Sequence, residues 1–100
     1  MKPAGYHPDA LREAEDSALY YEIRQPGLGH RFLDAVEVCQ RFVQQHPAAG
    51  APFELGTRRF RVKGFPYCLI YKEQAQGIFV VAVAHFSRKP GYWRERLADA

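Results

Sequence analysis

Basic residues recur through the C-terminal half of this chain at spacings that would gather them on one surface. Arg59, Arg61 and Lys63 alternate with apolar residues, so a strand here would present one cationic face and one apolar face. The arginine fork binds phosphates and carboxylates through two hydrogen bonds, which makes such a face suitable for an anionic partner. For Lys63, which precedes a glycine, a simple turn position is an open alternative.

A second group of candidates follows the last apolar run of the chain. His85 and Arg88 come where that run ends, and Tyr92 and Trp93 follow a few residues later. Histidine carries protons near neutral pH, and aromatic rings offer stacking surfaces for a base or a peptide side chain. The alternatives are that His85 is a hydrogen-bonded structural residue and that the two aromatic residues fold the tail back onto the domain.

These residue types permit one enzymatic reaction better than any other. In RNA cleavage by general acid–base catalysis, a 2′-hydroxyl attacks its own phosphate, cations stabilise the developing charge and a histidine or tyrosine transfers protons. Hydrolysis by paired carboxylates has little support, because the acidic residues concentrate in one N-terminal segment where a solvated helix face explains them: Glu13, Glu15, Asp16 and Glu22. Ser87 lacks the motif of a nucleophilic serine. The remaining histidines are assigned no role: His7, His30 and His46.

Cys39 and Cys68 lie within apolar periodic segments, and we expect them to be buried thiols. No spacing of cysteines and histidines indicates a metal site. We therefore expect neither a metal nor a cofactor.

Two amphipathic helices are predicted in the N-terminal half. Residues 8–23 begin with a proline, and apolar residues recur at helical spacing: Leu11, Ala14, Ala18 and Tyr21. Residues 28–45 carry a longer apolar stripe, made up of Leu28, Phe32, Ala35, Val36, Cys39, Phe42 and Val43. The short link between them predicts an antiparallel hairpin, which needs an apolar surface to pack against.

Three antiparallel strands in the C-terminal half would supply that surface. They are the alternating segment 59–63, residues 67–72 and residues 78–85, with a hairpin loop at 73–77. The run at 78–84 is almost entirely apolar, which indicates a strand covered on both faces. Residues 47–56 read as an irregular loop, residues 1–6 as an ambiguous edge strand and residues 92–97 as a short tail or helix. We expect one α+β domain, residues 1–100, with the order β-α-α-β-β-β and a mainly antiparallel sheet.

The charge is unevenly spread along the chain. Residues 1–57 carry a balance of −3 and residues 58–100 a balance of +6, which gives the net charge of +3. This asymmetry indicates an acidic partner for the C-terminal half, although a solvated basic face is the equal alternative. No apolar run approaches the ~20 residues of a membrane span, and the N-terminus is acidic where a signal peptide would be apolar, so we expect a cytoplasmic protein that does not bind membranes.

The order of these elements resembles the RelE/ParE toxin superfamily of bacterial type II toxin–antitoxin systems. The resemblance rests on RRFRVKGFPYCLIYK, GIFVVAVAH and SRKPGYWRER, and on the YYE…GLGHRF passage, and it covers nearly the whole chain. It implies a small toxin that a cognate antitoxin neutralises. The flexible segment of the antitoxin would wrap the toxin, and operator DNA would be bound only through the antitoxin.

Members of this family differ in their target. RelE-like toxins cut mRNA on the ribosome with basic and proton-transferring residues, whereas ParE-like toxins inhibit DNA gyrase without that catalytic set. The resemblance implies Arg59, Arg61, Lys63, His85 and Arg88 as catalytic residues if the chain is a ribonuclease. It implies Arg59, Arg61, Lys63, Arg88, Tyr92 and Trp93 as residues that bind the antitoxin or the target. Because His85 and Arg88 follow the ParE pattern, the ParE-like interpretation is favoured, with RelE-like cleavage and a non-toxic binding domain of the same fold as alternatives.

Overall fold

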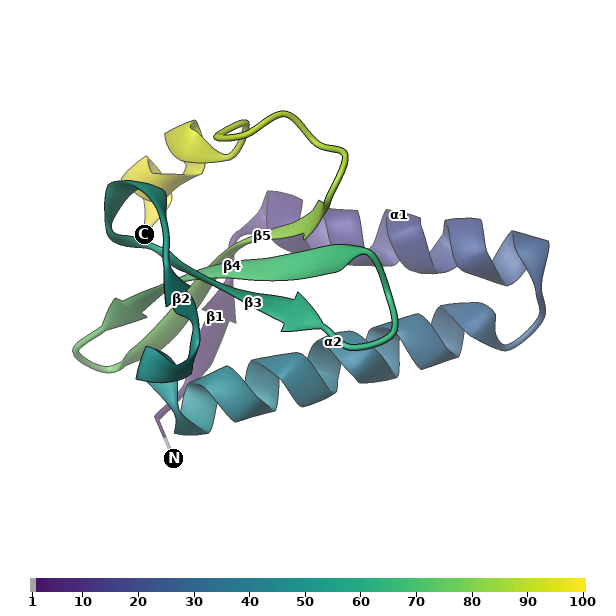
Figure 1. Cartoon of the computed structure of the whole chain (residues 1–100), viewed down its shortest axis with the longest axis horizontal. Coiled ribbons are helices and arrows are strands. Elements are labelled where there is room, and N and C mark those ends of the chain that lie inside the picture. The colour runs from purple at the N-terminus through teal and green to yellow at the C-terminus, as the bar shows by residue number, and fades with distance from the viewer. Residues whose placement is uncertain (1) are drawn as a thin grey trace.

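A five-stranded mixed sheet forms the centre of the molecule (Figure 1). The computed structural model describes residues 2–100, so Met1 of the expected opening strand lies outside the described residues. The strands are β1 (Ala4–Tyr6), β2 (Ala51–Pro52), β3 (Arg58–Val62), β4 (Tyr67–Gln74) and β5 (Gly77–His85). Their spatial order is β1-β5-β4-β3-β2. β1 pairs in parallel with β5, and the other neighbours pair antiparallel, which confirms the expected α+β class with a mainly antiparallel sheet.

Helices α1 (Pro8–Arg24) and α2 (Leu28–Gln45) form the predicted hairpin and cover one face of the sheet. The loop between them projects beyond the sheet, and both termini lie at the opposite end of the molecule (Figure 1). Gly27 begins α2 with a φ of 88°, a conformation that a glycine adopts without strain. The helices approach closely at Gly29, where an added Cβ would lie 2.5 Å from the carbonyl oxygen of Ala18.

The main core lies between the hairpin and the sheet. The fully buried Phe32 contacts the aromatic side chains of Tyr21, Phe65 and Tyr67, with ring centroids 4.8–5.4 Å apart. The stripe predicted for α2 is confirmed at Phe32, Val36, Cys39 and Val43 and wrong at Phe42, which is 43% exposed. The stripe predicted for α1 is wrong at one position, because Leu11 is 50% exposed and Ala10 is buried in its place. Small side chains at Ala10, Ala14 and Ala18 let α1 lie close to the sheet.

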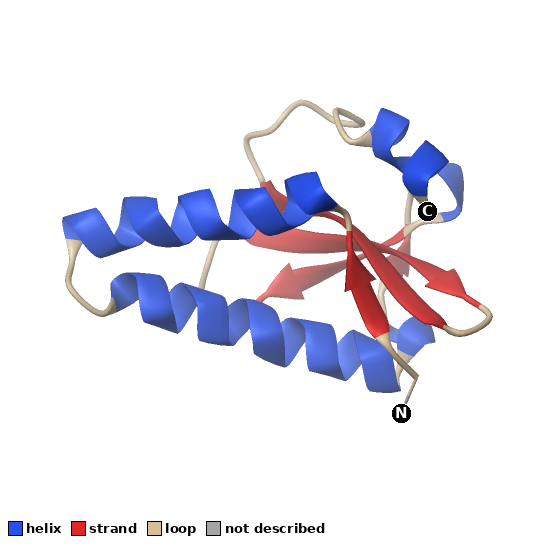
Figure 2. Cartoon of the chain, turned by 180° about the vertical axis from the view of Figure 1, so that it is seen from behind, coloured by secondary structure: helices blue, strands red, loops and turns tan. Residues whose placement is uncertain are grey.

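The opposite face of the sheet is covered by the C-terminal tail, which ends in the 3-10 helix η3 (Arg94–Asp99). Figure 2, seen from behind, shows this tail and the hairpin on opposite sides of the strands. A second, smaller apolar cluster forms here around Trp93, which is 1% exposed and packs on Phe53 at a centroid distance of 5.9 Å. β5 is therefore covered on both faces, as its apolar sequence predicts.

Two details of the expected strand pattern need correction. The loop at residues 47–56 contains β2, which pairs with β3 only at Ala51 and Pro52. Proline lacks the N–H that a longer ladder would need, which keeps this strand short. Lys63 lies in the turn after β3 rather than in the strand, so its predicted place among the alternating cations is wrong.

Candidate anion-binding cavity

A cavity of about 390 Å³ opens on the tail side of the sheet. Its cations come from two parts of the chain: Arg59 and Arg61 from β3, and Arg88 and Lys89 from the segment after β5. Its aromatic residues are Phe53, Phe86, Tyr92 and Trp93. The alternation of β3 places Arg59 and Arg61 on the same face, because side chains two residues apart point the same way.

Each of the three arginines lies against an aromatic ring. The guanidinium of Arg59 lies 4.7 Å from the ring centre of Phe53, and that of Arg61 lies 5.2 Å from Phe86. Arg88 stacks on Tyr92 at 3.8 Å. Stacking on a ring leaves the N–H edge of a guanidinium available, so these contacts orient the arginines without using up their donors.

Few acidic side chains of the protein pair with the cations of this cavity. Among residues 2–100, neither Arg59, Arg61 nor Lys89 forms an ion pair, and Arg88 has only a 3.9 Å contact with Glu13. The combination of unpaired guanidinium groups with aromatic walls suits a ligand that carries an anionic group next to an apolar or planar one.

His85 lines the cavity at the end of β5, and it also borders a hollow on the helix side together with Ser17 and Tyr67. It is the register partner of Tyr67, and the two rings meet edge to face at 5.0 Å. Tyr67 belongs to the helix-side core, where its hydroxyl donates to Ser17 at 2.9 Å. The Nδ1 atom of His85 accepts a hydrogen bond from the N–H of Ser87 at 2.9 Å. His85 thus lies at the rim of the cavity, with its ring packed against Tyr67 and its Nδ1 atom engaged by Ser87.

Other cations of the C-terminal half are directed away from this group. Arg58 donates to the carbonyl oxygen of Gly50 at 2.8 Å, and Arg94 pairs with Glu54 at 2.6 Å. Lys63 does not line the cavity. The cationic surface predicted from sequence is therefore smaller than expected, and it centres on Arg59, Arg61 and Arg88.

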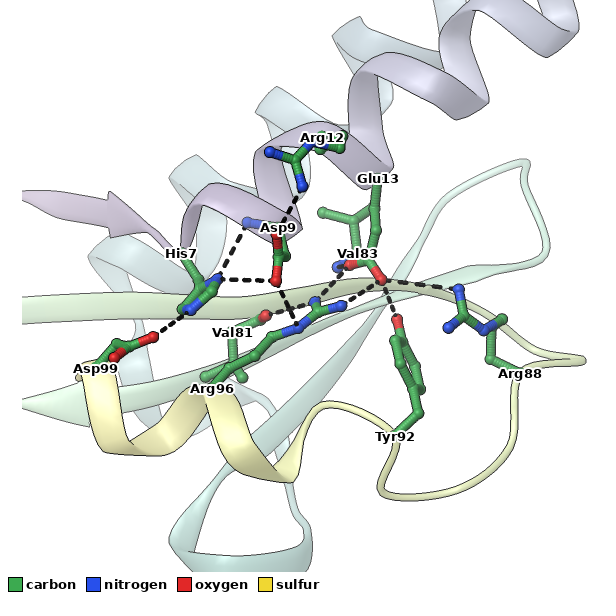
Figure 3. A network of polar contacts seen from close by, with 10 residues as sticks. All are labelled: His7, Asp9, Arg12, Glu13, Val81, Val83, Arg88, Tyr92, Arg96 and Asp99. Carbon is green, nitrogen blue, oxygen red and sulfur yellow. Dashed lines mark hydrogen bonds and ion pairs between the residues drawn. The ribbon is translucent and has the colours of Figure 1, made fainter.

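Glu13 is the most connected polar residue near the cavity, and its interpretation as part of a solvated face is wrong. Its carboxylate accepts from Tyr92 Oη at 2.6 Å and from two nitrogens of Arg96 at 2.9 and 3.1 Å (Figure 3). It also accepts from the N–H of Val83 at 3.1 Å, on the edge of β5 that β1 leaves unpaired. Burial, and then this hydrogen bond to Glu13, raise the pKa of Tyr92.

Two further residues have structural roles that sequence reasoning missed. His7 is 6% exposed, caps α1 by accepting from the N–H of Asp9 at 3.0 Å, and contacts Asp99 at 2.7 Å through Nε2. Glu22 accepts from the N–H groups of Gly27 and Gly29 at the start of α2, and the bond to Gly27 is the main cause that lowers its pKa. The sequence signal for Glu22 is an acidic residue near the end of α1 that is close enough in the chain to reach the start of α2.

The two thiols differ in position. Burial raises the pKa of Cys39 to about 12, and this residue lies in the main core. Cys68 is half-buried in the wall of the cavity, where burial raises its pKa and the charges of Arg59 and Arg61 partly oppose the shift. Within residues 2–100, no group of three or more metal-binding side chains is found, and no helix has the length and apolarity to cross a membrane.

No family model matches the sequence, and a search of curated proteins finds no match. Among solved structures, the chain is similar to a chain of the chromosomal ParDE toxin–antitoxin system from P. aeruginosa. The TM-score is 0.76 at 16% identity, and the match covers 85% of this chain and 96% of the other. The chain has a RelE/ParE-like fold. The fold implied by the sequence resemblance is thereby confirmed.

Proposed function

We propose that this chain is the toxin of a type II toxin–antitoxin system, and that it acts in the cytoplasm. Two observations support the proposal. The chain has the fold of a protein from a ParDE system, and a strongly cationic cavity is built by the arginines singled out from sequence.

We further propose that the toxin is ParE-like and inhibits DNA gyrase by binding it. The observation that carries this choice is that the His85 ring packs against Tyr67 and its Nδ1 atom accepts from the N–H of Ser87. A ribonuclease needs a proton carrier that is free to act next to its phosphate-binding cations. Tyr92 does not replace it, since its hydroxyl donates to Glu13 and its pKa is raised. The cavity is thus equipped to bind rather than to transfer protons, with Arg59, Arg61, Arg88, Tyr92 and Trp93 as the contact residues. Trp93, being nearly buried, would act mainly as the floor.

The proposed antitoxin has a segment with acidic residues that meets the cavity. Complementary charge accelerates such an encounter and fixes its register. The helical hairpin and the sheet edge next to β2 are the further docking surfaces, and they leave operator DNA to be bound by the antitoxin alone.

Inhibition of gyrase supercoiling by the purified protein tests the proposed target. We expect inhibition at micromolar protein, and loss of inhibition in the double variant Arg59→Gln/Arg61→Gln. Lys63→Gln is the matched control, because it removes a cation two residues further along the chain but outside the cavity. Absence of inhibition by the unaltered protein at micromolar excess would count against gyrase as the target.

RelE-like cleavage of mRNA is the second candidate, because guanidinium groups that gather in one cavity also suit a phosphate. Primer extension on a translated mRNA tests it. Cleavage that depends on both His85 and Arg88 would favour this candidate and would require the His85 ring to turn toward the arginines. A protein that does not affect growth when expressed would favour a non-toxic binding domain instead.

A further inference from the structure

One carboxylate makes more of the polar contacts that attach the C-terminal tail to the rest of the molecule than any other residue. Glu13 of α1 receives hydrogen bonds from Tyr92 and Arg96 of the tail and from the N–H of Val83 on β5 (Figure 3). Arg96 in turn donates to the carbonyl oxygen of Val81 at 3.1 Å. The side chains of Glu13 and Arg96 are only 15% and 14% exposed, so the pair is shielded from water and stronger than a surface ion pair.

This tail also forms a wall of the cavity. We call residues 88–100 the strap, because they cross the tail side of the sheet from the end of β5. The strap contributes Arg88, Lys89, Pro90, Tyr92 and Trp93 to the cavity lining. Arg88 stacks on the ring of Tyr92, and the hydroxyl of Tyr92 donates to Glu13. Glu13 therefore determines where the guanidinium of Arg88 lies relative to Arg59 and Arg61.

Other contacts of the strap are few. Trp93 is its fully buried side chain, and Leu97 is partly buried. Asp99 contacts His7 at 2.7 Å, and Arg94 pairs with Glu54 at 2.6 Å. η3 has one short run of 3-10 hydrogen bonds and does not pair with the sheet as a strand. A segment that buries so little apolar surface opens at a lower free energy than the main core does. Polar contacts therefore contribute much of what holds the strap closed, and Glu13 makes the most of them, with hydrogen bonds to Tyr92 and Arg96.

We propose that Glu13 is a positioning residue that latches the strap over the sheet, and that ligand binding in the cavity is coupled to this closure. The proposal rests on the proposed function only in treating the cavity as the binding site. A ligand that contacts both Arg88 and Tyr92 binds better when the strap is closed, so it stabilises the closed state. Because the coupling is reciprocal, the contacts of Glu13 that hold the strap closed also raise the affinity for the ligand. Opening of the strap would expose Trp93 and remove one of the three arginines from the cavity.

The variant Glu13→Gln tests the latch, with Glu15→Gln as the matched control, since Glu15 is an exposed acid on the same helix without a hydrogen bond to the strap in residues 2–100. Amide hydrogen exchange is measured at Arg94, Arg96 and Ala100, whose N–H groups are hydrogen-bonded within the strap. We expect exchange about tenfold faster in Glu13→Gln than in the control, because a charge-assisted bond is lost. Acrylamide quenching of Trp93, the single tryptophan of the chain, should rise in parallel.

Tyr92→Phe provides a second variant that keeps the ring beneath Arg88 and removes only the hydroxyl, should Glu13→Gln fail to fold. It should accelerate strap exchange to a smaller extent. Exchange in both variants equal to that of Glu15→Gln would overturn the latch.

A fluorescent peptide of ten glutamates serves as the anionic probe for the coupling. We expect it to slow strap exchange in the unaltered protein and to bind Glu13→Gln several-fold more weakly. Equal affinity for the two proteins would overturn the coupling. Neither readout involves gyrase, so a working latch in a protein that does not inhibit supercoiling would contradict the proposed target alone.

Discussion

The two faces of the sheet are built in different ways. The helix side is a continuous apolar core in which Phe32, Val43 and Val80 are fully buried. The tail side holds a small cluster around Trp93, and polar contacts from Glu13 and His7 keep its cover in place. Apolar packing on the helix side thus supplies the stability, whereas the tail side combines a weaker cover with unpaired arginines. This division is expected where a binding site must be able to rearrange.

The largest effect should come from the helix-side core. Phe32→Ala removes a ring with no exposed surface that contacts three other aromatic side chains, and we expect it to lower the free energy of unfolding by about 3–5 kcal/mol. Urea denaturation followed by circular dichroism measures the change. Leu33→Ala is the control, since this neighbour is 39% exposed and should cost much less. Equal losses from the two variants would contradict the central place of Phe32.

A smaller loss is expected on the tail side. Trp93→Ala deletes the buried ring of the smaller cluster, but the strap can detach without unfolding the sheet, which limits the loss to roughly 2 kcal/mol. Hydrogen exchange should accelerate in residues 94–100 and stay unchanged in β4. If β4 also exchanges faster, the two faces of the sheet do not unfold independently.

The two thiols report separately on the two faces. A disulfide reagent should modify Cys68 well before Cys39, because Cys39 is buried in the helix-side core and burial raises its pKa to about 12. The free energy of unfolding should also fall as pH rises above 9, the ordinary pKa of the thiol, toward 12, since the unfolded state releases its proton first. Cys39→Ala should make this decline shallower. Faster labelling of Cys39 than of Cys68 would contradict the assignment.

The smallest effect on stability is expected from the cavity arginines. Arg59 and Arg61 are exposed and form no ion pairs within residues 2–100, so Arg59→Gln/Arg61→Gln should change the free energy of unfolding by less than about 0.5 kcal/mol. Urea denaturation beside Lys63→Gln provides the comparison. A large loss would indicate that these arginines support the fold rather than a ligand.

Local patterns in the sequence predict most of this fold. The helical stripe of α2, the apolar run of β5 and the alternation of β3 each follow from the burial of one face or both. The boundaries of the hairpin follow from Pro8, which fixes φ at the start of α1, and from Gly27, which can adopt the positive φ before α2. The gathering of Arg59 and Arg61 also follows from strand alternation.

The role of Glu13 could not be predicted in this way. Its partners Tyr92 and Arg96 lie 79 and 83 residues away, and no local pattern connects them. The contrast between an acidic N-terminal half and a basic C-terminal half is the available signal, and by itself it indicates an external acidic partner or a solvated basic face equally well. Some of these opposite charges pair with each other inside the molecule, because Arg96 pairs with Glu13 and Arg94 pairs with Glu54.

Growth after induced expression tests the central claim, namely that the arginines of the tail side carry the activity. The unaltered protein, Arg59→Gln/Arg61→Gln and Lys63→Gln are expressed to equal abundance in a bacterial host without the antitoxin. We expect arrest with the unaltered protein and with Lys63→Gln, and normal growth with the double variant. Arrest by the double variant as strong as that of the unaltered protein would contradict the account.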